Sequence, residues 1–349
     1  MFQNSLVDLG LGFPFARNSK GGFSFFNTGV QFYTNSQKIR NMSTSHNRRE
    51  FFKISAAGAA GLALLGIQGC GSATKPAAAI DKKSFGVGIQ LYTLRDAIAA
   101  DLMGTLKTVS ALGYKNLELA GYADGKFYEY APKEFLKIVN DLGMDILSSH
   151  TQVEAKGISL DNAKIMADAH AELGVKYCVQ PWVNDEDRNL EYYRKMVGEL
   201  NQVGNIMKGV GIQFAYHNHN FDFKSFDGIV PYFDIFMKEM DPALITMEID
   251  LFWVNKAGQD PVEMFKKYPG RFQLFHFKDM RTKQEPFYDV IKDDVCSVGA
   301  GVIDFKTILA SKEIAGMKYL FVEDDNQGNG KTFEELEVSI NNITTKILV

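Results

Sequence analysis

The 349-residue chain lacks the features of several common protein classes. Three cysteines are too few for a disulfide framework in a chain of this length. The net charge of −4 gives no basic field that would attract nucleic acid. With 46% hydrophobic and 23% charged residues, the composition excludes wholesale disorder and is that of an ordinary globular protein.

The first 41 residues show no pattern of a folded domain. They are rich in Phe, Asn, Ser and Gly and have no sustained period of 2 or 3.6. We predict that residues 1–41 are unstructured. Met42 begins a different type of sequence, so we favour Met42 as the start and interpret residues 1–41 as a start-site artefact.

Residues 42–70 have the parts of an export signal. The pair Arg48-Arg49 precedes Phe51-Phe52-Lys53, and an apolar run follows at 54–67. An arginine pair in this position is typical of twin-arginine signals. The alternatives are a short membrane anchor and a buried Ala/Gly helix. The run has about 14 residues, whereas a spanning helix needs roughly 20.

The end of this signal resembles a lipoprotein cleavage site. Ile67-Gln68-Gly69-Cys70 fits that pattern, although Gln68 is bulkier than the usual residue. We therefore predict an exported protein, either periplasmic or lipid-anchored at the cell envelope, with a lipid on Cys70 as its membrane attachment. Residues 71–84 are interpreted as a linker.

From residue 85 onward, short runs of β-branched and aromatic residues alternate with helical periodicity. This alternation predicts βα units and a parallel sheet. The expected strands are 85–91, 114–120, 144–150, 175–180, 212–219, 244–251, 271–278 and 317–323. The expected helices are 97–112, 132–142, 159–173, 189–209, 231–240, 261–269, 303–313 and 332–346.

Eight strands and eight helices in residues 85–349 predict an α/β fold, a single-domain (β/α)8 TIM barrel. Glycines follow several of the helices, where αβ turns need positive φ: Gly113, Gly143, Gly174, Gly211, Gly270 and Gly316. The rival is a doubly wound open sheet, which normally has a Gly-rich phosphate turn after its first strand. Residues 90–95 form no such turn, so the barrel is favoured.

Polar residues occur where the predicted strands end, which is where catalytic groups of such barrels lie. Four of the six histidines are among them. In chain order these residues are Gln90, Glu118, His150, Gln180, His217, His219, Glu248, Asp250, His276, Lys278 and Glu323.

The alternation of side chains along a strand sorts these residues to one face. Three strands carry polar pairs two residues apart, which share a face: His217 with His219, Glu248 with Asp250, and His276 with Lys278. Apolar neighbours suit the opposite, outer face: Ala215, Ile249, Leu251, Phe275 and Phe277. We therefore expect the polar pairs to point into the barrel mouth.

Imidazoles and carboxylates gathered at one barrel mouth form a mixed nitrogen and oxygen ligand set. A single buried His or Glu is more often a hydrogen-bonded core residue, but convergence from four strand ends indicates a shared purpose. Such ligands suit Mn²⁺, Co²⁺ or Zn²⁺ better than Ca²⁺ or Mg²⁺. We predict one divalent metal ion, with Mn²⁺ favoured and Co²⁺, Zn²⁺ or Mg²⁺ as alternatives.

Several stretches between residues 85 and 349 resemble a known family. They are Tyr216–Phe223 (YHNHNFDF), Glu248–Trp253 (EIDLFW), Gly258–Pro261 (GQDP), His276–Asp279 (HFKD), Val298–Phe305 (VGAGVIDF) and Phe321–Asp324 (FVED). Together they resemble the sugar phosphate isomerase/epimerase family, which has a xylose isomerase-like TIM barrel. The resemblance implies a carbohydrate substrate and one divalent metal held by Glu, Asp, His and Glu from the fifth to eighth strands. Barrels of this family often pair, which leaves a homodimer open.

The last three family ligands match Asp250, His276 and Glu323, while His217 stands at the first position, with His219 as the alternative. Relatives that epimerise a ketose often use two metal-bound glutamates as the acid/base pair. A metal-bound imidazole is a poor proton carrier, so the base must come from elsewhere. The catalytic candidates are Glu323, Glu248, His150 and Lys278. Lys278 would stabilise an oxyanion or, alternatively, form a salt bridge.

Other residues at the strand ends are candidates for sugar contacts: Gln90, Glu118, His219, Trp182 and Trp253. The mouth has no cluster of Arg and Lys that would clamp a phosphate. An exported enzyme would also not meet sugar phosphates. We therefore expect an unphosphorylated sugar or glycoside derivative as the partner, and no nucleic acid.

These features support three functional hypotheses. The leading one is metal-dependent isomerisation or epimerisation, in which a base removes the proton next to a carbonyl and an enediolate results. The second is a lyase or dehydratase that expels a β-leaving group from a keto-sugar or keto-glycoside, which needs one well-placed base rather than two. The third is a non-catalytic sugar-binding protein.

Overall fold

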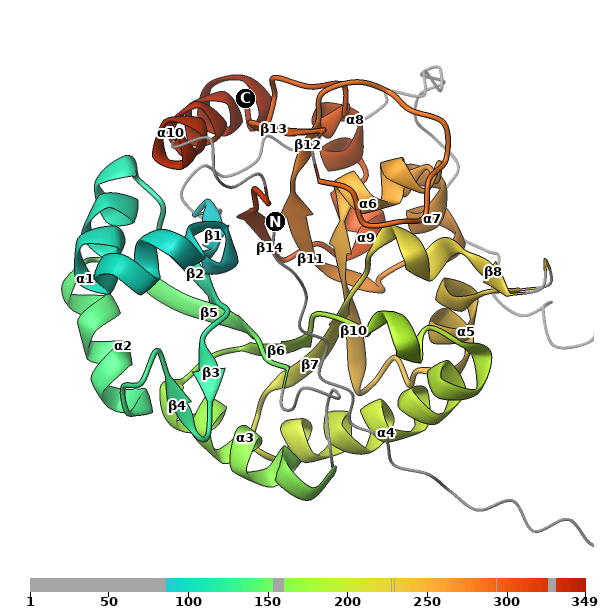
Figure 1. The fold of residues 1–349 in the computed structure, drawn as a ribbon, viewed down its shortest axis with the longest axis horizontal. Helices are drawn as coiled ribbons and strands as arrows, with labels where there is room; N and C mark the ends of the chain where they lie inside the picture. Colours follow the sequence, from blue (N-terminus) through green and yellow to red (C-terminus); the bar gives the residue numbers. More distant parts are fainter. Residues whose placement is uncertain (1–85, 153–159, 227, 229, 293, 326–330) are drawn as a thin grey trace, which may run out of the picture. The chain divides into compact units, whose positions relative to one another are not determined.

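The computed structural model describes residues 86–349 except 153–159, 227, 229, 293 and 326–330. The described residues form a closed barrel of eight strands ringed by helices (Figure 1). Its strand order is β1-β14-β11-β10-β7-β6-β5-β2, and neighbouring strands are parallel. The barrel prediction is thus confirmed. The predicted start-site artefact, export signal, Cys70 lipid and linker lie outside the described residues.

All eight barrel strands fall within their predicted ranges. They are β1 (Gly88–Gln90), β2 (Asn116–Leu119), β5 (Asp145–His150), β6 (Tyr177–Gln180), β7 (Gln213–His217), β10 (Ile245–Asp250), β11 (Phe272–Phe277) and β14 (Tyr319–Val322). The expectation succeeds because most of these strands are short runs with β-branched or aromatic residues bounded by turn residues, whereas β2 (Asn-Leu-Glu-Leu) has neither type.

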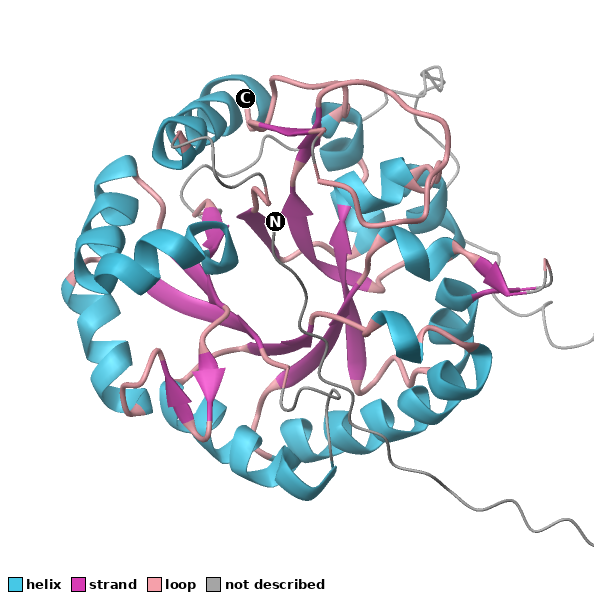
Figure 2. Ribbon diagram, viewed as in Figure 1, coloured by secondary structure: helices cyan, strands magenta, loops and turns pink. Residues whose placement is uncertain are grey.

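The helices lie outside the strands (Figure 2). They are α1 (Arg95–Leu112), α2 (Pro132–Asp141), α3 (Leu160–Leu173), α4 (Leu190–Gly209), α5 (Tyr232–Glu239), α7 (Pro261–Lys267), α8 (Phe305–Ala310), α9 (Lys312–Ala315) and α10 (Thr332–Asn342), which continues as a π-helical turn, Ile343–Ile347. The single helix expected at 303–313 is therefore wrong, because α8 and α9 are separate. None of the described helices combines the length and apolar character needed to cross a membrane.

Several short elements that the periodicity did not predict lie at the carboxyl end of the barrel. They are α6 (Leu251–Lys256) and three hairpins: β3 (Tyr122–Ala123) with β4 (Lys126–Phe127), β8 (Ser225–Phe226) with β9 (Val230–Pro231), and β12 (Asp279–Met280) with β13 (Val295–Cys296). Helix α6 begins directly after β10 because Asp250 Oδ1 accepts a hydrogen bond from the Trp253 backbone N–H at 2.9 Å. One residue thus ends a strand and caps a helix.

The barrel interior is filled by a small apolar cluster beneath the polar strand ends. Its buried members are Leu147, Tyr177, Val179, Ala215, Leu274 and Phe321. The expectation that Ala215 faces outward is wrong, because residues two apart share a face and Ala215 lies two before His217. The other four expected outer residues do belong to the larger core around the barrel: Ile249, Leu251, Phe275 and Phe277.

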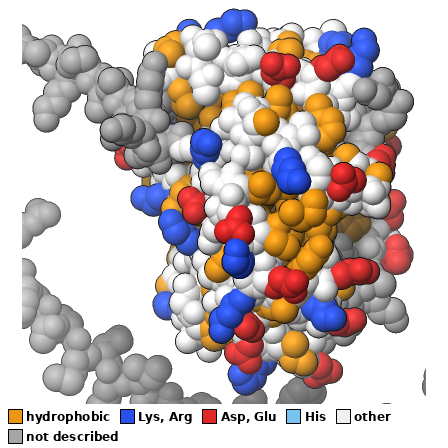
Figure 3. Space-filling view, turned by 90° about the vertical axis from the view of Figure 1, so that its left-hand side faces the viewer, with side chains coloured by type: hydrophobic (Ala, Val, Ile, Leu, Met, Phe, Trp, Pro, Cys, Tyr) orange, Lys and Arg blue, Asp and Glu red, His pale blue; other side chains and the backbone are white. Residues whose placement is uncertain are grey.

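The outer surface of the barrel is chemically mixed on the side that carries α1 and α2. Figure 3 shows acidic, basic and apolar side chains interspersed there, without a concentration of basic groups on this face. Such a mixture is ordinary for a globular domain, in which much of the accessible surface is apolar.

Candidate functional site

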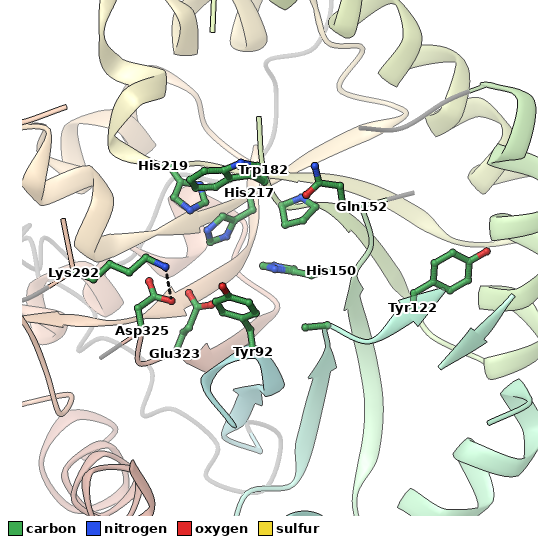
Figure 4. A pocket seen from close by; sticks show the side chains of 12 residues that line it. Tyr92, Tyr122, His150, Gln152, Trp182, His217, His219, Lys292, Glu323 and Asp325 are labelled. Atoms are coloured by element: carbon green, nitrogen blue, oxygen red, sulfur yellow. Dashed lines mark ion pairs between the residues drawn. The ribbon is translucent and has the colours of Figure 1, made fainter. Parts of the chain in front are cut away.

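A cavity of about 490 Å³ opens at the carboxyl ends of the strands. Figure 4 shows most of its labelled side chains gathered around His150 and His217, with Tyr122 lying apart. Its lining consists of Tyr92, Ala120, Tyr122, His150, Gln152, Pro181, Trp182, His217, His219, Lys292, Glu323 and Asp325. The cavity is within the roughly 300–1,000 Å³ range of small-molecule sites.

Four residues predicted as metal ligands meet at the base of this cavity. The potential ligand atoms of His217, Asp250, His276 and Glu323 lie within 4.8 Å of one another. His217 Nε2 is 4.0 Å from Asp250 Oδ2, and His276 Nδ1 is 3.9 Å from the same oxygen. Glu323 Oε2 is 3.0 Å from His276 Nδ1. All four side chains are buried, so they form a compact donor set at the ends of four neighbouring strands.

The second nitrogen of each imidazole meets a buried carboxylate. His217 Nδ1 is 3.0 Å from Glu248 Oε2, and His276 Nε2 is 2.6 Å from Glu118 Oε1. Metal-ligating histidines typically donate their other N–H to such a carboxylate, which fixes the ring and leaves the opposite nitrogen for the metal. The arrangement therefore presents His217 Nε2 and His276 Nδ1 toward Asp250 and Glu323.

The protonation of His217 and the state of Asp250 also fit a divalent cation. Burial, together with the neighbouring imidazoles, holds the pKa of His217 well below its usual value, so the ring is neutral as a ligand must be. Asp250 Oδ2 accepts no hydrogen bond within the described chain, although the Lys278 ammonium lies 3.0 Å away. This mixed nitrogen and oxygen set suits a transition metal or zinc ion.

Lys278 forms ion pairs with carboxylates of the cluster from a buried position outside the cavity wall. Its Nζ lies 3.0 Å from Asp250, 2.6 Å from Glu323 and 2.8 Å from Asp325. Burial opposes its charge, but these carboxylates outweigh burial and raise the pKa of Lys278 well above its usual value. The side chain is 1% exposed and does not line the cavity. Of the two roles predicted for Lys278, oxyanion stabilisation and a salt bridge, its contacts match the salt bridge.

Among the four catalytic candidates, only His150 and Glu323 reach the cavity wall. His150 Nε2 lies 2.5 Å from Glu248 Oε2 and 3.2 Å from Glu118 Oε1, and its ring stacks on that of His276. Glu248 is fully buried beneath it. Burial disfavours a charged His150, but Glu118 and Glu248 outweigh this and raise the pKa of the ring.

The two buried glutamates have different charge states. Burial, followed by the charge of Glu118, raises the pKa of Glu248 to about 7. The pKa of Glu118 is lowered to about 2, because the nearby imidazoles of His150 and His276 overcome its burial. Glu118 is therefore an anionic anchor for His276, and Glu248 titrates near neutral pH next to His150.

The predicted sugar-binding residues divide into two groups. His219 and Trp182 line the cavity, and their rings meet edge to face at 4.8 Å. Burial lowers the pKa of His219 well below its usual value, so it is a neutral hydrogen-bonding group. Gln90 and Glu118 are fully buried and bonded to each other at 2.8 Å, which places them beneath the cavity wall.

Trp253 does not form part of a sugar-stacking wall. It lies on α6 rather than in a loop, has no exposed surface and is absent from the cavity lining. Its ring packs near His219, at 5.4 Å, and beneath the Lys278 ammonium, at 5.2 Å. The Asp250 cap turns the chain into a helix at this point, and the indole is buried there.

Sequence reasoning missed several cavity residues. Tyr122, Gln152, Lys292 and Asp325 line the cavity but were not among the candidates. The Asp124-Gly125 pair is a readable hairpin signal that would have placed Tyr122 on a turn after the second strand. The loop that carries Lys292 has no such signal.

Imidazole and carboxylate side chains that converge at the strand ends of a parallel barrel are a donor set suited to a divalent metal. The chain belongs to the xylose isomerase-like TIM barrel family, whose model matches residues 106–338. It is 26% identical to an inosose dehydratase from Geobacillus thermodenitrificans over 147 residues, which are 39% of this chain and 48% of that protein. An inosose dehydratase from Bacillus anthracis is 28% identical over 149 residues, again 39% and 48%. The chain thus spans about half the length of these curated relatives.

Solved structures share the whole barrel. A sugar phosphate isomerase/epimerase from Parabacteroides distasonis matches with a TM-score of 0.64 at 28% identity, covering 79% of this chain and 100% of that one. The IolI protein, solved with a bound zinc atom, matches with a TM-score of 0.59 at 16% identity, covering 75% and 99%. The latter likeness shows the fold alone.

Proposed function

We propose that the chain is a metal-dependent lyase of the dehydratase type, which removes the proton next to a carbonyl of a keto-sugar or keto-glycoside and expels a β-leaving group. The observation that carries this proposal is the position of His150. It faces the cavity next to His217, Asp250, His276 and Glu323, and Glu118 and Glu248 pair with its Nε2. A second group of side chains that could hold a metal, namely His150, His217, Glu248 and His276, makes metal binding the alternative role of His150.

His217, Asp250, His276 and Glu323 would hold the cation. A divalent ion bound there would polarise the substrate carbonyl and stabilise the negative charge that develops on its oxygen. Lys278 contributes a fixed positive charge behind Asp250 and Glu323, which favours the ionised form of both carboxylates. At Asp250 burial opposes this effect and raises the pKa of the carboxyl above its usual value.

His150 would accept the proton. When the C–H bond next to the carbonyl breaks, the proton moves to the imidazole and the electron pair enters the enolate. Glu248, 2.5 Å from Nε2, and Glu118 stabilise the imidazolium that results. As the enolate collapses, the bond to the β-oxygen breaks and His150 returns the proton to the departing oxygen. One residue thus acts as base and then as acid.

Epimerisation, the leading hypothesis from the sequence, is the second candidate. It requires a second proton carrier on the opposite face of the substrate. Glu323 faces the cavity, but Lys278 and His276 overcome its burial and hold its pKa well below the usual value. Such a carboxylate is a poor base at neutral pH. The relatives named inosose dehydratase also support elimination.

An uncharged substrate fits the cavity best. Among the described residues that line the cavity, Lys292 is the one with a permanent positive charge. Its Nζ lies 3.6 Å from a carboxylate oxygen of Asp325, and this negative charge offsets the charge of the lysine. This supports the expectation of an unphosphorylated substrate.

Residues 42–70 are proposed to direct export of the chain. The test is to locate the chain in cell fractions before and after Arg48 and Arg49 are both replaced by lysine.

The test is incubation of the Mn²⁺-loaded chain with a panel of keto-sugars, keto-glycosides and cyclic polyol ketones in D₂O. Elimination predicts an unsaturated ketone, seen by its ultraviolet absorbance and by NMR, together with the released alcohol or water. An epimer carrying deuterium at the inverted carbon would instead establish epimerisation. Chelator-insensitive binding with neither product would establish a non-catalytic sugar-binding protein.

A further inference from the structure

Lys292 faces the cavity on the side away from His150. Figure 4 shows Lys292 and Asp325 on one side of His217 and Glu323, and His150 on the other. All five residues line the same cavity of about 490 Å³. A sugar ring whose carbonyl meets the proposed metal ligands and whose C–H bond faces His150 therefore presents its far edge to Lys292. That edge of a sugar carries hydroxyl groups, to which the proposed proton transfer assigns no partner.

The Lys292 ammonium is held at this wall by a carboxylate and an aromatic ring. Its Nζ lies 3.6 Å from Asp325 Oδ1 and 5.6 Å from the centre of the Tyr92 ring. Asp325 is itself fixed, because its Oδ2 accepts a hydrogen bond from Lys278 Nζ at 2.8 Å. An ammonium has three N–H donors, and 3.6 Å is longer than an ordinary hydrogen bond. The ion pair therefore leaves donors of Lys292 for a substrate oxygen.

The segment that carries Lys292 is fastened to the barrel by a buried amide. Residues 281–292, which follow β12, form neither helix nor strand. Asn220 Nδ2 donates hydrogen bonds to the backbone carbonyls of Phe287 at 3.0 Å and Asp289 at 2.8 Å. Asn220 is fully buried and directly follows the cavity residue His219. One side chain thus joins the segment to the end of the fifth barrel strand.

Two further contacts fix the same segment against α6 and the turn after it. Lys256 Nζ donates to the carbonyl of Ile291, the residue before Lys292, at 2.6 Å. Gly258 has a φ of 71°, and a Cβ there would lie 2.5 Å from the ring of Pro286, so this approach requires glycine. The backbone that carries Lys292 is therefore held in place right up to the neighbouring residue.

We propose that Lys292 is a specificity-determining residue, which donates a hydrogen bond to a hydroxyl of the substrate ring on the side away from the carbon that loses its proton. Asp325 and Asn220 are positioning residues that hold the ammonium there. A paired ammonium and carboxylate suit a neutral polyol, since one donates to a hydroxyl and the other accepts from one. The inference rests on the proposed function and narrows the substrate class to keto-sugars and polyol ketones with a free hydroxyl at that edge.

The contact is tested by calorimetric binding to the full, Mn²⁺-loaded chain, with the methyl β-glycosides of glucose, galactose and mannose and with myo-inositol as probes. The tightest of these is then compared with its single-deoxy derivatives. We expect removal of one hydroxyl to weaken binding about 10- to 100-fold, as for a hydrogen bond to a charged group. In Lys292→Met the same removal should change the affinity less than about twofold, while the other hydroxyls keep their effects.

The controls separate the ammonium from the segment that carries it. Lys292→Arg keeps a charged donor and should retain the dependence on that hydroxyl. Lys283→Met, which alters an exposed lysine of the same segment, should behave as the parent. Asn220→Ala should reduce the effect of that one hydroxyl although Lys292 is still present, and it should speed hydrogen exchange of the backbone amides at 287–292. A merely structural role of Asn220 would instead lower the affinity for every probe equally.

Equal effects of each hydroxyl in the parent and in Lys292→Met would overturn the contact, as would the same change in Lys283→Met or failure of every probe to bind the parent. Circular dichroism shows whether each variant is folded, and Lys292→Ala takes the place of Lys292→Met if the latter unfolds. Because the assay measures binding without turnover, the expected hydroxyl dependence with no elimination product would refute the proposed function and leave the Lys292 contact standing. Elimination with the same KM in the parent and in Lys292→Met would do the reverse.

Discussion

The replacement His150→Asn tests the assignment of the base most sharply. Asparagine keeps a polar group that can donate to Glu118 or Glu248, but it cannot accept a proton near neutral pH. General acid–base catalysis contributes about 10²- to 10⁴-fold to a rate. His150 is placed in both proton transfers, so we expect kcat to fall by about 10³-fold or more. Metal affinity should change little, because the proposed ligands are His217, Asp250, His276 and Glu323; a large loss of affinity would instead favour the second possible ligand group, His150, His217, Glu248 and His276.

The assay follows formation of the unsaturated product by Mn²⁺-loaded chain, with metal content measured in each sample. His219→Asn is the matched control, because His219 also lines the cavity and is neutral, yet it has no buried carboxylate within hydrogen-bonding distance. We expect this control to raise KM more than it lowers kcat. If His150→Asn kept kcat within threefold of the parent at equal metal content, the base would have to be another group.

Three further variants, one of them with a matched control, test the supporting structure. Glu118→Gln should weaken metal binding about 10- to 100-fold in a competition titration, because Glu118 orients His276 at 2.6 Å; unchanged affinity would contradict that role. Lys278→Met should lower the free energy of unfolding of the chelator-treated chain by about 3–5 kcal/mol, since it leaves buried carboxylates uncompensated. Lys164→Met, which breaks an exposed ion pair, should change the free energy of unfolding by less than about 1 kcal/mol. Similar losses in Lys278→Met and Lys164→Met would show that the buried Lys278 stabilises the fold no more than an exposed lysine does. His170 is buried, which lowers its pKa to about 4, so only the unfolded chain binds this proton between pH 6.5 and 4. Stability should therefore fall by about 3 kcal/mol more over that range in the parent than in His170→Gln, as measured by urea unfolding, and parallel curves would exclude the effect.

The strands and the convergence of the candidate ligand side chains could be predicted because local sequence determines both. Alternation along β7, β10 and β11 fixes which side chains share a face, and parallel topology brings their carboxyl ends together. His217, Asp250 and His276 therefore converge although each comes from a different strand. Alternation alone does not separate His217 from His219, because they share a face; the strand end does, since β7 stops at His217 and His219 lies beyond it.

The parts that could not be predicted depend on contacts between distant segments. Asp325 meets Lys278 across 47 positions, and no local pattern encodes that pairing. Trp253 was expected in a loop because the Asp250 cap, which starts α6, is a side-chain contact rather than a periodicity. The orientation of Tyr122 depends on packing against Phe127 and His170, so even a correctly read hairpin turn would not have placed its ring in the cavity wall.

The most direct test of the account is a crystal structure of the Mn²⁺-loaded chain with anomalous data collected at the manganese absorption edge. The account predicts one strong peak within about 2.0–2.3 Å of His217 Nε2, Asp250 Oδ2, His276 Nδ1 and Glu323 Oε2. The side chain of His150 should face the cavity without touching the ion. A peak coordinated instead by His150 and Glu248, or a stoichiometric metal bound away from these strand ends, would contradict both the ligand set and the assignment of His150 as the base.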